Sequence, residues 1–94
     1  MAVRSFRHKG LRRLYEQGDS KGLVPEQVKK LTNMLTLLDE AVVSDDMGVY
    51  PGWRLHRLKG DMKGFWSLTV SGNWRLVLRM ESGGAYDVDL IDYH

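Results

Sequence analysis

The clearest pattern along the chain is an apolar stripe with helical spacing between residues 24 and 42. Its members recur at alternating steps of four and three, as Val24, Val28, Leu31, Leu35, Leu38 and Val42. Such steps place side chains on one face of an α-helix. Pro25 suits the first turn of that helix, where a missing N–H costs no hydrogen bond. The stripe is broad enough to predict a long helix packed on a sheet.

Two shorter elements are expected before this helix. Residues 3–6 predict a short strand, and residues 9–17 predict a helix that ends at Gly18, a residue suited to a C-terminal cap. The apolar face of that first helix would contain Leu11, Leu14 and Tyr15. Residues 43–52 predict a loop.

After residue 53 the apolar period changes to two, as in β-strands. Strands are expected at residues 53–57, 65–70, 74–80 and 85–91, with a hairpin turn at residues 71–73. One face would join the core through Trp66, Leu68, Val70, Trp74, Leu76, Leu78, Met80, Tyr86, Val88 and Leu90. The opposite face would be uncovered, with Phe65, Ser67, Thr69, Arg75, Val77 and Arg79 on it.

These elements predict an α+β fold in one domain, residues 1–94. Two N-terminal helices would pack on one face of a small, mostly antiparallel sheet of four to five strands. A length of 94 residues allows one core, and 43% hydrophobic with 28% charged residues is ordinary for a soluble protein. The chain has no cysteine, and it shows no signal peptide and no membrane span. We therefore expect a cytoplasmic protein that does not bind membranes.

Charge is distributed unevenly, although the net charge is only +2. Basic residues gather near the start and in the middle of the chain, while most acidic residues lie elsewhere. This distribution is equally consistent with a face that binds a polyanionic ligand and with two solvated surfaces.

Residues of the types needed to cleave RNA lie within residues 53–75 and at the chain end. His56 is able to move a proton near neutral pH, and Lys59 and Arg75 are suited to holding a phosphate. The chain ends in Asp92-Tyr93-His94, which adds further proton-exchanging groups.

Each of these residues also has a plainer interpretation. By spacing alone, His56 and Lys59 are more often surface residues than two members of one cleft. Arg75, in mid-strand, requires either an acid, Asp87 or Asp89, or an anionic ligand. The chain end resembles an ordinary frayed terminus. No spacing predicts a metal site or a cofactor site.

The aromatic residues give a further expectation. The tryptophans Trp53, Trp66 and Trp74 are most simply core residues, and alternation places Trp66 and Trp74 under the helices. Only Phe65 and Trp53 then remain as candidates for stacking on RNA bases.

Three segments together resemble HigB toxins of the RelE/ParE superfamily. They are RSFRHKGLRRLYEQG, LHRLKGDMKGFWSLTVSGNWRLVLRM and AYDVDLIDYH. The resemblance covers nearly the whole chain and rests on the motifs LHxLKGD, GxWS, NWR and a terminal DYH. Arg57 stands where this family often has proline.

The resemblance implies a type II toxin that cleaves mRNA in the decoding site of the ribosome. Its partner would be a HigA-like helix-turn-helix antitoxin, through which alone it would contact operator DNA. The catalytic positions would be His56, Lys59, Arg75, Asp92, Tyr93 and His94. Contacts with RNA or the ribosome are expected from Lys9, Arg12, Arg13, Lys29, Lys30, Arg54, Arg57 and Lys63.

Two rival functions are open to the same fold. One is a toxin that poisons DNA gyrase; that branch lacks the set of histidines and lysine present here. The other is a non-catalytic RNA-binding or co-repressor module. The first would inhibit supercoiling and leave message intact, and the second would not arrest growth when expressed alone.

Overall fold

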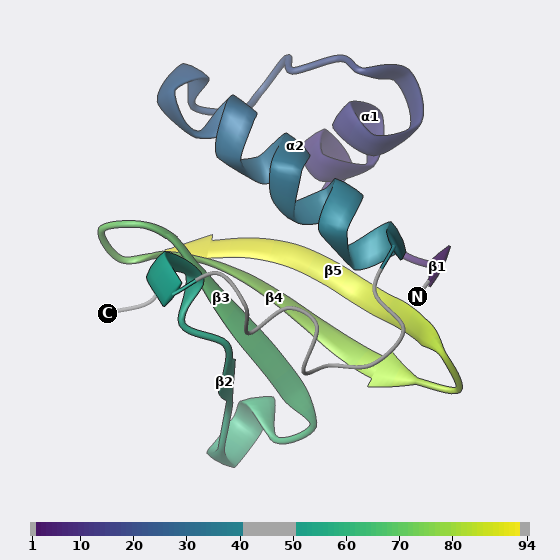
Figure 1. Ribbon diagram of the computed structural model, residues 1–94, viewed down its shortest axis with the longest axis vertical. Helices are drawn as coiled ribbons and strands as arrows, with labels where there is room; N and C mark the ends of the chain where they lie inside the picture. Colours follow the sequence, from purple (N-terminus) through teal and green to yellow (C-terminus); the bar gives the residue numbers. More distant parts are fainter. Residues whose placement is uncertain (1, 41–50, 93–94) are drawn as a thin grey trace.

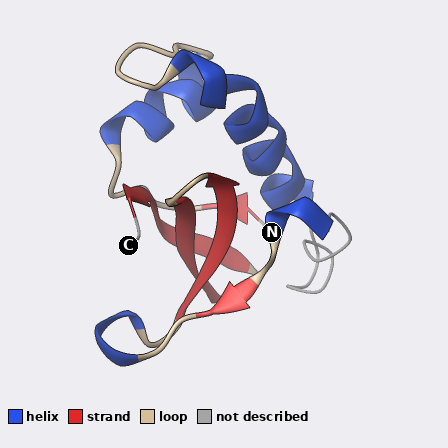
Figure 2. Cartoon of the chain, turned by 90° about the vertical axis from the view of Figure 1, so that its left-hand side faces the viewer, coloured by secondary structure: helices blue, strands red, loops and turns tan. Residues whose placement is uncertain are grey.

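Two layers make up the protein, whose computed structural model describes residues 2–40 and 51–92. Helices α1 (Lys9–Gln17) and α2 (Pro25–Glu40) lie on one face of a sheet (Figure 1). The strands in the described residues are β1 (Ala2–Val3), β2 (His56–Arg57), β3 (Phe65–Ser71), β4 (Trp74–Glu81) and β5 (Gly84–Asp92). Two short 3-10 helices, η2 (Pro51–Trp53) and η3 (Gly60–Met62), flank β2. Figure 2 shows the same two layers from the side.

The strand order is β1-β5-β4-β3-β2. β1 runs parallel to β5, and the other neighbours are antiparallel, so the sheet is mixed. This arrangement confirms the predicted α+β class. The first strand is shorter than predicted, because only Ala2–Val3 form a ladder and Phe6 makes a single bridge to Val88.

Helix α1 begins and ends where the sequence pattern predicts. Nδ1 of His8 accepts a hydrogen bond from the backbone N–H of Leu11 at 3.1 Å, which caps the N-terminus. Gly18 takes a left-handed conformation with φ of 69°, and its N–H bonds to carbonyls of the last turn. Both ends are therefore set by local chemistry.

Helix α2 covers the sheet with its apolar face. Leu31, Met34 and Leu38 are fully buried against Leu68 and Leu76 of the central strands. Complete burial of a leucine or methionine side chain stabilises a fold by roughly 1.5–3 kcal/mol, so each of these side chains contributes about that much. Val24 was expected in the same stripe, but it precedes the helix and is 41% exposed. Residues 41 and 42 lie outside the described residues, as does most of the predicted loop at 43–52.

The sheet face opposite the helices is not uncovered, contrary to the prediction. A small second core joins Leu58, Phe65 and Val77, with Met62 and Ile91 packed against it. The segment that follows β2 folds across this part of the face. Phe65 is only 7% exposed, so the prediction that it stacks on RNA bases is wrong.

Two further details of the sheet differ from the predictions. The expected strand at 53–57 is mostly η2 and an irregular link, and only two residues pair with β3. In β5 the register shifts beside Asp87, which has a φ of 53°. This bulge places Tyr86 opposite Arg79, and Ala85 joins the main core in its place.

Candidate active site

A pocket of about 300 Å³ lies on the sheet face away from the helices. Strand pairing explains its composition, since His56 lies opposite Ser67 and Thr69 lies opposite Arg75. Because alternate residues share a face, all four side chains point to the same side. The full lining is Arg54, Leu55, His56, Leu58, Ser67, Thr69 and Arg75. The structure thus brings His56 and Arg75 together, as the sequence predicted, and adds two hydroxyl side chains.

Arg75 is half-buried and is held by backbone carbonyls. Its Nη1 donates to the carbonyl oxygen of Gly72 at 2.7 Å and to that of Trp74 at 3.1 Å. A guanidinium has five N–H donors, and no bond to another described residue uses the remaining three. Arg75 can therefore present a positive charge and a donor edge to a ligand in the pocket.

The acid partner considered for Arg75 is accounted for elsewhere. Asp87 accepts a hydrogen bond from Nε of Arg79 at 2.8 Å, and Glu81 accepts one from Nη1 at 2.6 Å. These bonds, the Asp87 bond first, raise the pKa of Arg79. Asp89 accepts from the backbone N–H of Leu90. None of the ion pairs among residues 2–40 and 51–92 includes Arg75, so the Asp87 alternative is wrong.

Arg54 enters the pocket from the link between η2 and β2, and His56 enters it from the first position of β2. Both side chains are exposed. Arg54 has a φ of 47°, a left-handed backbone conformation that non-glycine residues rarely adopt. Such strain is frequent at functional sites, where the surrounding structure holds it.

Lys59 lies beside this pocket but does not line it. It belongs to a neighbouring hollow of about 330 Å³ formed with Arg57, Leu58, Lys63 and two glycines. Leu58 is 7% exposed and lines both hollows. Lys59 is exposed and makes no side-chain cap to η3, which begins after it. The site is therefore two adjoining cationic hollows rather than one cleft.

Arg57 projects to the opposite side of β2 from His56. It pairs with Trp66, and its guanidinium lies 5.0 Å from the centroid of the indole ring. Trp66 is half-buried on the helix side of the sheet, where Arg57 covers it. Trp53 and Trp74 pack against the main core, which agrees with their simplest interpretation.

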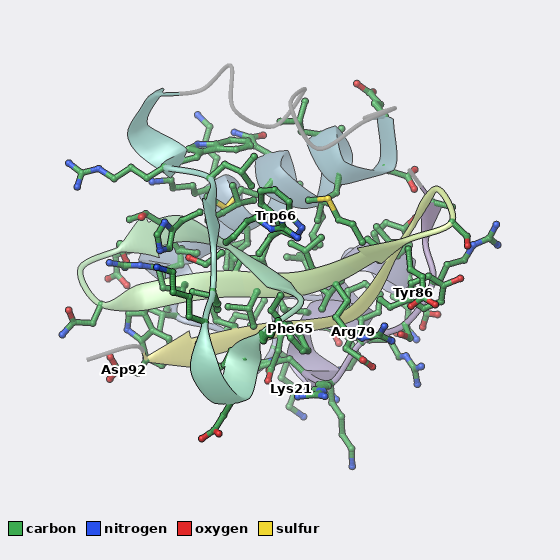
Figure 3. All side chains as sticks on the ribbon, turned by 90° about the horizontal axis from the view of Figure 1, so that it is seen from below. Lys21, Phe65, Trp66, Arg79, Tyr86 and Asp92 are labelled. Atoms are coloured by element: carbon green, nitrogen blue, oxygen red, sulfur yellow. The ribbon has the colours of Figure 1, made fainter. Side chains whose placement is uncertain are left out.

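Asp92 is the last described residue and ends β5, far along the sheet from Arg79 and Tyr86 (Figure 3). It pairs with Trp74, whereas its neighbour Ile91 pairs with Arg75. Alternation therefore directs Asp92 toward the other face from Arg75. The predicted catalytic residues Tyr93 and His94 lie outside the described residues.

The basic residues of the helices lie on the far side of the sheet from the pocket. They are Lys9, Arg12, Arg13, Lys29 and Lys30. Lys9, Arg12 and Lys29 are exposed, whereas Arg13 is half-buried and its Nη2 donates to the carbonyl oxygen of Lys21 at 3.5 Å. The cations of α1 and α2 therefore lie on one side of the sheet, and the cations that line the pocket lie on the other.

Ser67 and Thr69 were not proposed as site residues from the sequence. Ser67 is 5% exposed and Thr69 is half-buried, and both line the pocket between His56 and Arg75. Their alternation with Leu68 was the available signal, because it placed them on the face of Arg75.

Across residues 2–40 and 51–92, no group of three or more His, Cys, Asp or Glu side chains could hold a metal ion. Over the same ranges, no helix combines the length and the apolar character that crossing a membrane requires.

Comparisons with known proteins agree over nearly the full chain. Residues 4–94 match a family described as the RelE-like toxin of the type II toxin–antitoxin system HigB. The "Endoribonuclease HigB" of Proteus vulgaris is 37% identical over 94 residues, covering 98% of this chain and 99% of that protein. "Toxin HigB-1" of Vibrio cholerae is 31% identical over 86 residues, covering 90% of each.

A solved structure with the same fold is that of a YafQ variant from E. coli. It superposes with a TM-score of 0.56 at 15% sequence identity, covering 93% of this chain and 88% of that one. This likeness concerns the fold, whereas the family match and the two relatives concern descent. The chain belongs to the HigB-like family of RelE-like toxins of type II toxin–antitoxin systems.

Proposed function

We propose that this toxin is a ribosome-dependent endoribonuclease that cuts mRNA in the decoding site and so stops translation. The observation that carries the proposal is the pocket in which Arg54, His56 and Arg75 converge beside Lys59. A polyanion bound there would meet three cations and a proton-exchanging imidazole. The name of the Proteus vulgaris relative, an endoribonuclease, supports the same activity.

The chemistry uses the nucleophile that RNA supplies. A base removes the proton from a 2′-OH, and the resulting oxygen attacks the adjacent phosphorus. The bond from phosphorus to the 5′-oxygen then breaks, and an acid protonates that oxygen. The products are a 2′,3′-cyclic phosphate and a 5′-OH, and the reaction requires no metal.

Arg75 and Lys59 act as the clamp for charge that develops on the phosphorane. The half-buried guanidinium of Arg75 offers a fork of donors, which suits two phosphate oxygens at once. Lys59 contributes a mobile point charge from the adjoining hollow. Groups of this kind stabilise a transition state by a few kcal/mol each, roughly 3–4 for one well-placed donor.

His56 and His94 exchange the protons in this proposal. An imidazole titrates near neutral pH and can serve as either base or acid. Tyr93 and Asp92 orient the reacting groups or assist the transfer. The register directs Asp92 away from the face of Arg75, which favours a supporting role for it over contact with the phosphate.

The partners follow from the family and from the arrangement of charge. A type II toxin has a cognate antitoxin, here proposed as a HigA-like helix-turn-helix protein that carries the toxin to operator DNA. The exposed cations of α1 and α2 would hold ribosomal RNA by sequence-independent attraction. Arg54, at the pocket, and Arg57 and Lys63, at the adjoining hollow, would add contacts with RNA there. The pocket on the other side of the sheet would then receive the message.

A reconstituted translation reaction tests the proposal. Wild-type toxin is expected to cut message only when ribosomes are present, and the Lys59→Ala, Arg75→Ala double variant is expected to lose that activity. Cleavage that is unchanged in the double variant would exclude the clamp. Inhibition of supercoiling with intact message would instead identify a gyrase poison, and binding without either effect would identify a non-catalytic module.

A further inference from the structure

A glutamine sits in the apolar layer between α2 and the sheet. Gln27, in the first turn of α2, is only 3% exposed. Its Nε2 donates to the hydroxyl of Ser71 at 2.9 Å, whereas its buried Oε1 has no partner among the described residues. An apolar residue of similar size at this position would leave no buried acceptor without a partner. The hydrogen bond from Gln27 to Ser71 therefore points to a role for the glutamine.

A β-bulge is what makes this bond possible. Thr69 pairs with Arg75 and Ser71 pairs with Trp74, so the register shifts by one residue between the two pairs. Strict alternation would direct Ser71 to the face of Thr69, away from the helices. The bulge re-aims Ser71 toward α2, where Gln27 meets it.

The next residue in the chain holds Arg75. Gly72 is the first of two residues in the β3–β4 turn and has a φ of 52°, a conformation that favours glycine. Its carbonyl oxygen accepts from Nη1 of Arg75 at 2.7 Å, the shorter of the two bonds that hold the guanidinium. Fixing Ser71 therefore fixes the peptide that orients Arg75.

We propose that Gln27 is a positioning residue for Arg75, acting through its hydrogen bond to Ser71 and the carbonyl of Gly72. Helix α2 would set the aim of a guanidinium that lies on the opposite face of the sheet. The consequence for RNA cleavage rests on the proposed function, whereas the consequence for the Arg75 side chain does not.

The first test measures the side chain directly. In nitrogen-15 spectra of the full chain, the Arg75 guanidinium should show slow rotation at Nη1, because two carbonyls hold it. Gln27→Met and Ser71→Ala should each make that rotation faster. Ser71→Thr, which keeps the hydroxyl, should keep the rotation slow. Thr32→Val, which removes a hydrogen bond within α2 to the carbonyl of Val28, should have no effect.

The second test is a double-variant cycle on cleavage in the translation reaction. Gln27→Met should slow cleavage on the order of tenfold, within the hundredfold that a 1 Å misplacement can cost. In an Arg75→Lys background the same change should have almost no further effect. Ser71→Ala, at the exposed end of the bond, serves as the second variant if Gln27→Met does not fold.

Each outcome decides one of the two proposals. An unchanged Arg75 signal, or the same loss in both backgrounds, would overturn the role of Gln27. If Arg75→Lys itself leaves cleavage unchanged, the clamp in the proposed function fails, and the spectra still decide whether Gln27 holds the guanidinium.

Discussion

Replacing Arg75 is the sharpest perturbation of the proposed site. Two of its five N–H donors are occupied by the carbonyls of Gly72 and Trp74, which leaves three for a phosphate. Removing one well-placed donor at a developing oxyanion typically costs about 100-fold to 1000-fold in rate, or roughly 3–4 kcal/mol. Arg75→Ala removes the charge and the whole fork, so we expect a loss near the upper end.

A conservative replacement should separate charge from geometry. Arg75→Lys keeps a cation but loses the planar fork and cannot make the same pair of carbonyl contacts. We expect a loss near the lower end, about 100-fold. The assay is single-turnover cleavage of message on programmed ribosomes, with toxin in excess.

Arg79 provides the matched control, because it lies on the same strand and the same face four residues later. Its guanidinium is bonded to Asp87 and Glu81 and lies over the ring of Tyr86. Arg79→Ala should lower the thermal midpoint and leave ribosome-bound cleavage nearly unchanged. The reasoning is refuted if the Arg79 variant loses as much activity as Arg75→Ala, or if Arg75→Ala cleaves at nearly the wild-type rate.

Three further predictions concern stability and ribosome binding. Asp39 accepts a hydrogen bond from Tyr15 at 2.7 Å, and this bond raises the pKa of the Tyr15 phenol above its ordinary value of 10.0. The stability that the bond contributes is present below about pH 10 and is lost as the pH rises through the raised pKa. Urea unfolding should therefore show wild type losing more stability than Tyr15→Phe as the pH rises past 10, and equal slopes would contradict this. Leu31→Ala should lower the free energy of unfolding by about 2–5 kcal/mol, because Leu31 is fully buried in the main core; a loss under 1 kcal/mol would be too small. Lys9→Glu with Lys29→Glu should weaken ribosome binding, most strongly at low salt, and leave the cleavage rate of bound toxin unchanged; a reduced bound rate would place these residues in the chemistry.

Local signals sufficed for the elements whose ends are set locally. Residues 9–17 form the predicted helix because the apolar spacing lies within the segment and Gly18 caps it directly after its last residue. The β3–β4 hairpin also follows from its own alternation and turn residues. His56 and Arg75 share a pocket because alternation and antiparallel pairing together place them on one face.

The predictions that were wrong concern features that the alternation of residues along one strand does not reveal. One extra residue at a bulge reverses the face of the sheet to which the side chains beyond it point. For this reason Tyr86 faces Arg79 instead of the core. Phe65 was predicted to be open because its cover, Leu58 and Met62, comes from a segment with no strand of its own. Buried Leu58 also separates Lys59 from His56, and both side chains are exposed, which agrees with the expectation from their spacing alone.

Gln27 shows the same limit for polar residues. A glutamine in the first turn of a helix is ordinarily solvated, and nothing in the sequence marks its partner 44 residues later. The hydrogen bond to Ser71 satisfies the buried Nε2, and it depends on a bulge that the sequence does not show.

The chemical ends of the cut message test the central claim most directly. The samples are the message fragments that appear in a translation reaction with wild-type toxin but not in a matched reaction with Arg75→Ala. These fragments would be sequenced after a treatment that distinguishes cyclic phosphate ends from hydroxyl ends. We predict 2′,3′-cyclic phosphate and 5′-hydroxyl ends, as attack by the neighbouring 2′-OH requires. Ends bearing a 3′-hydroxyl and a 5′-phosphate would contradict it.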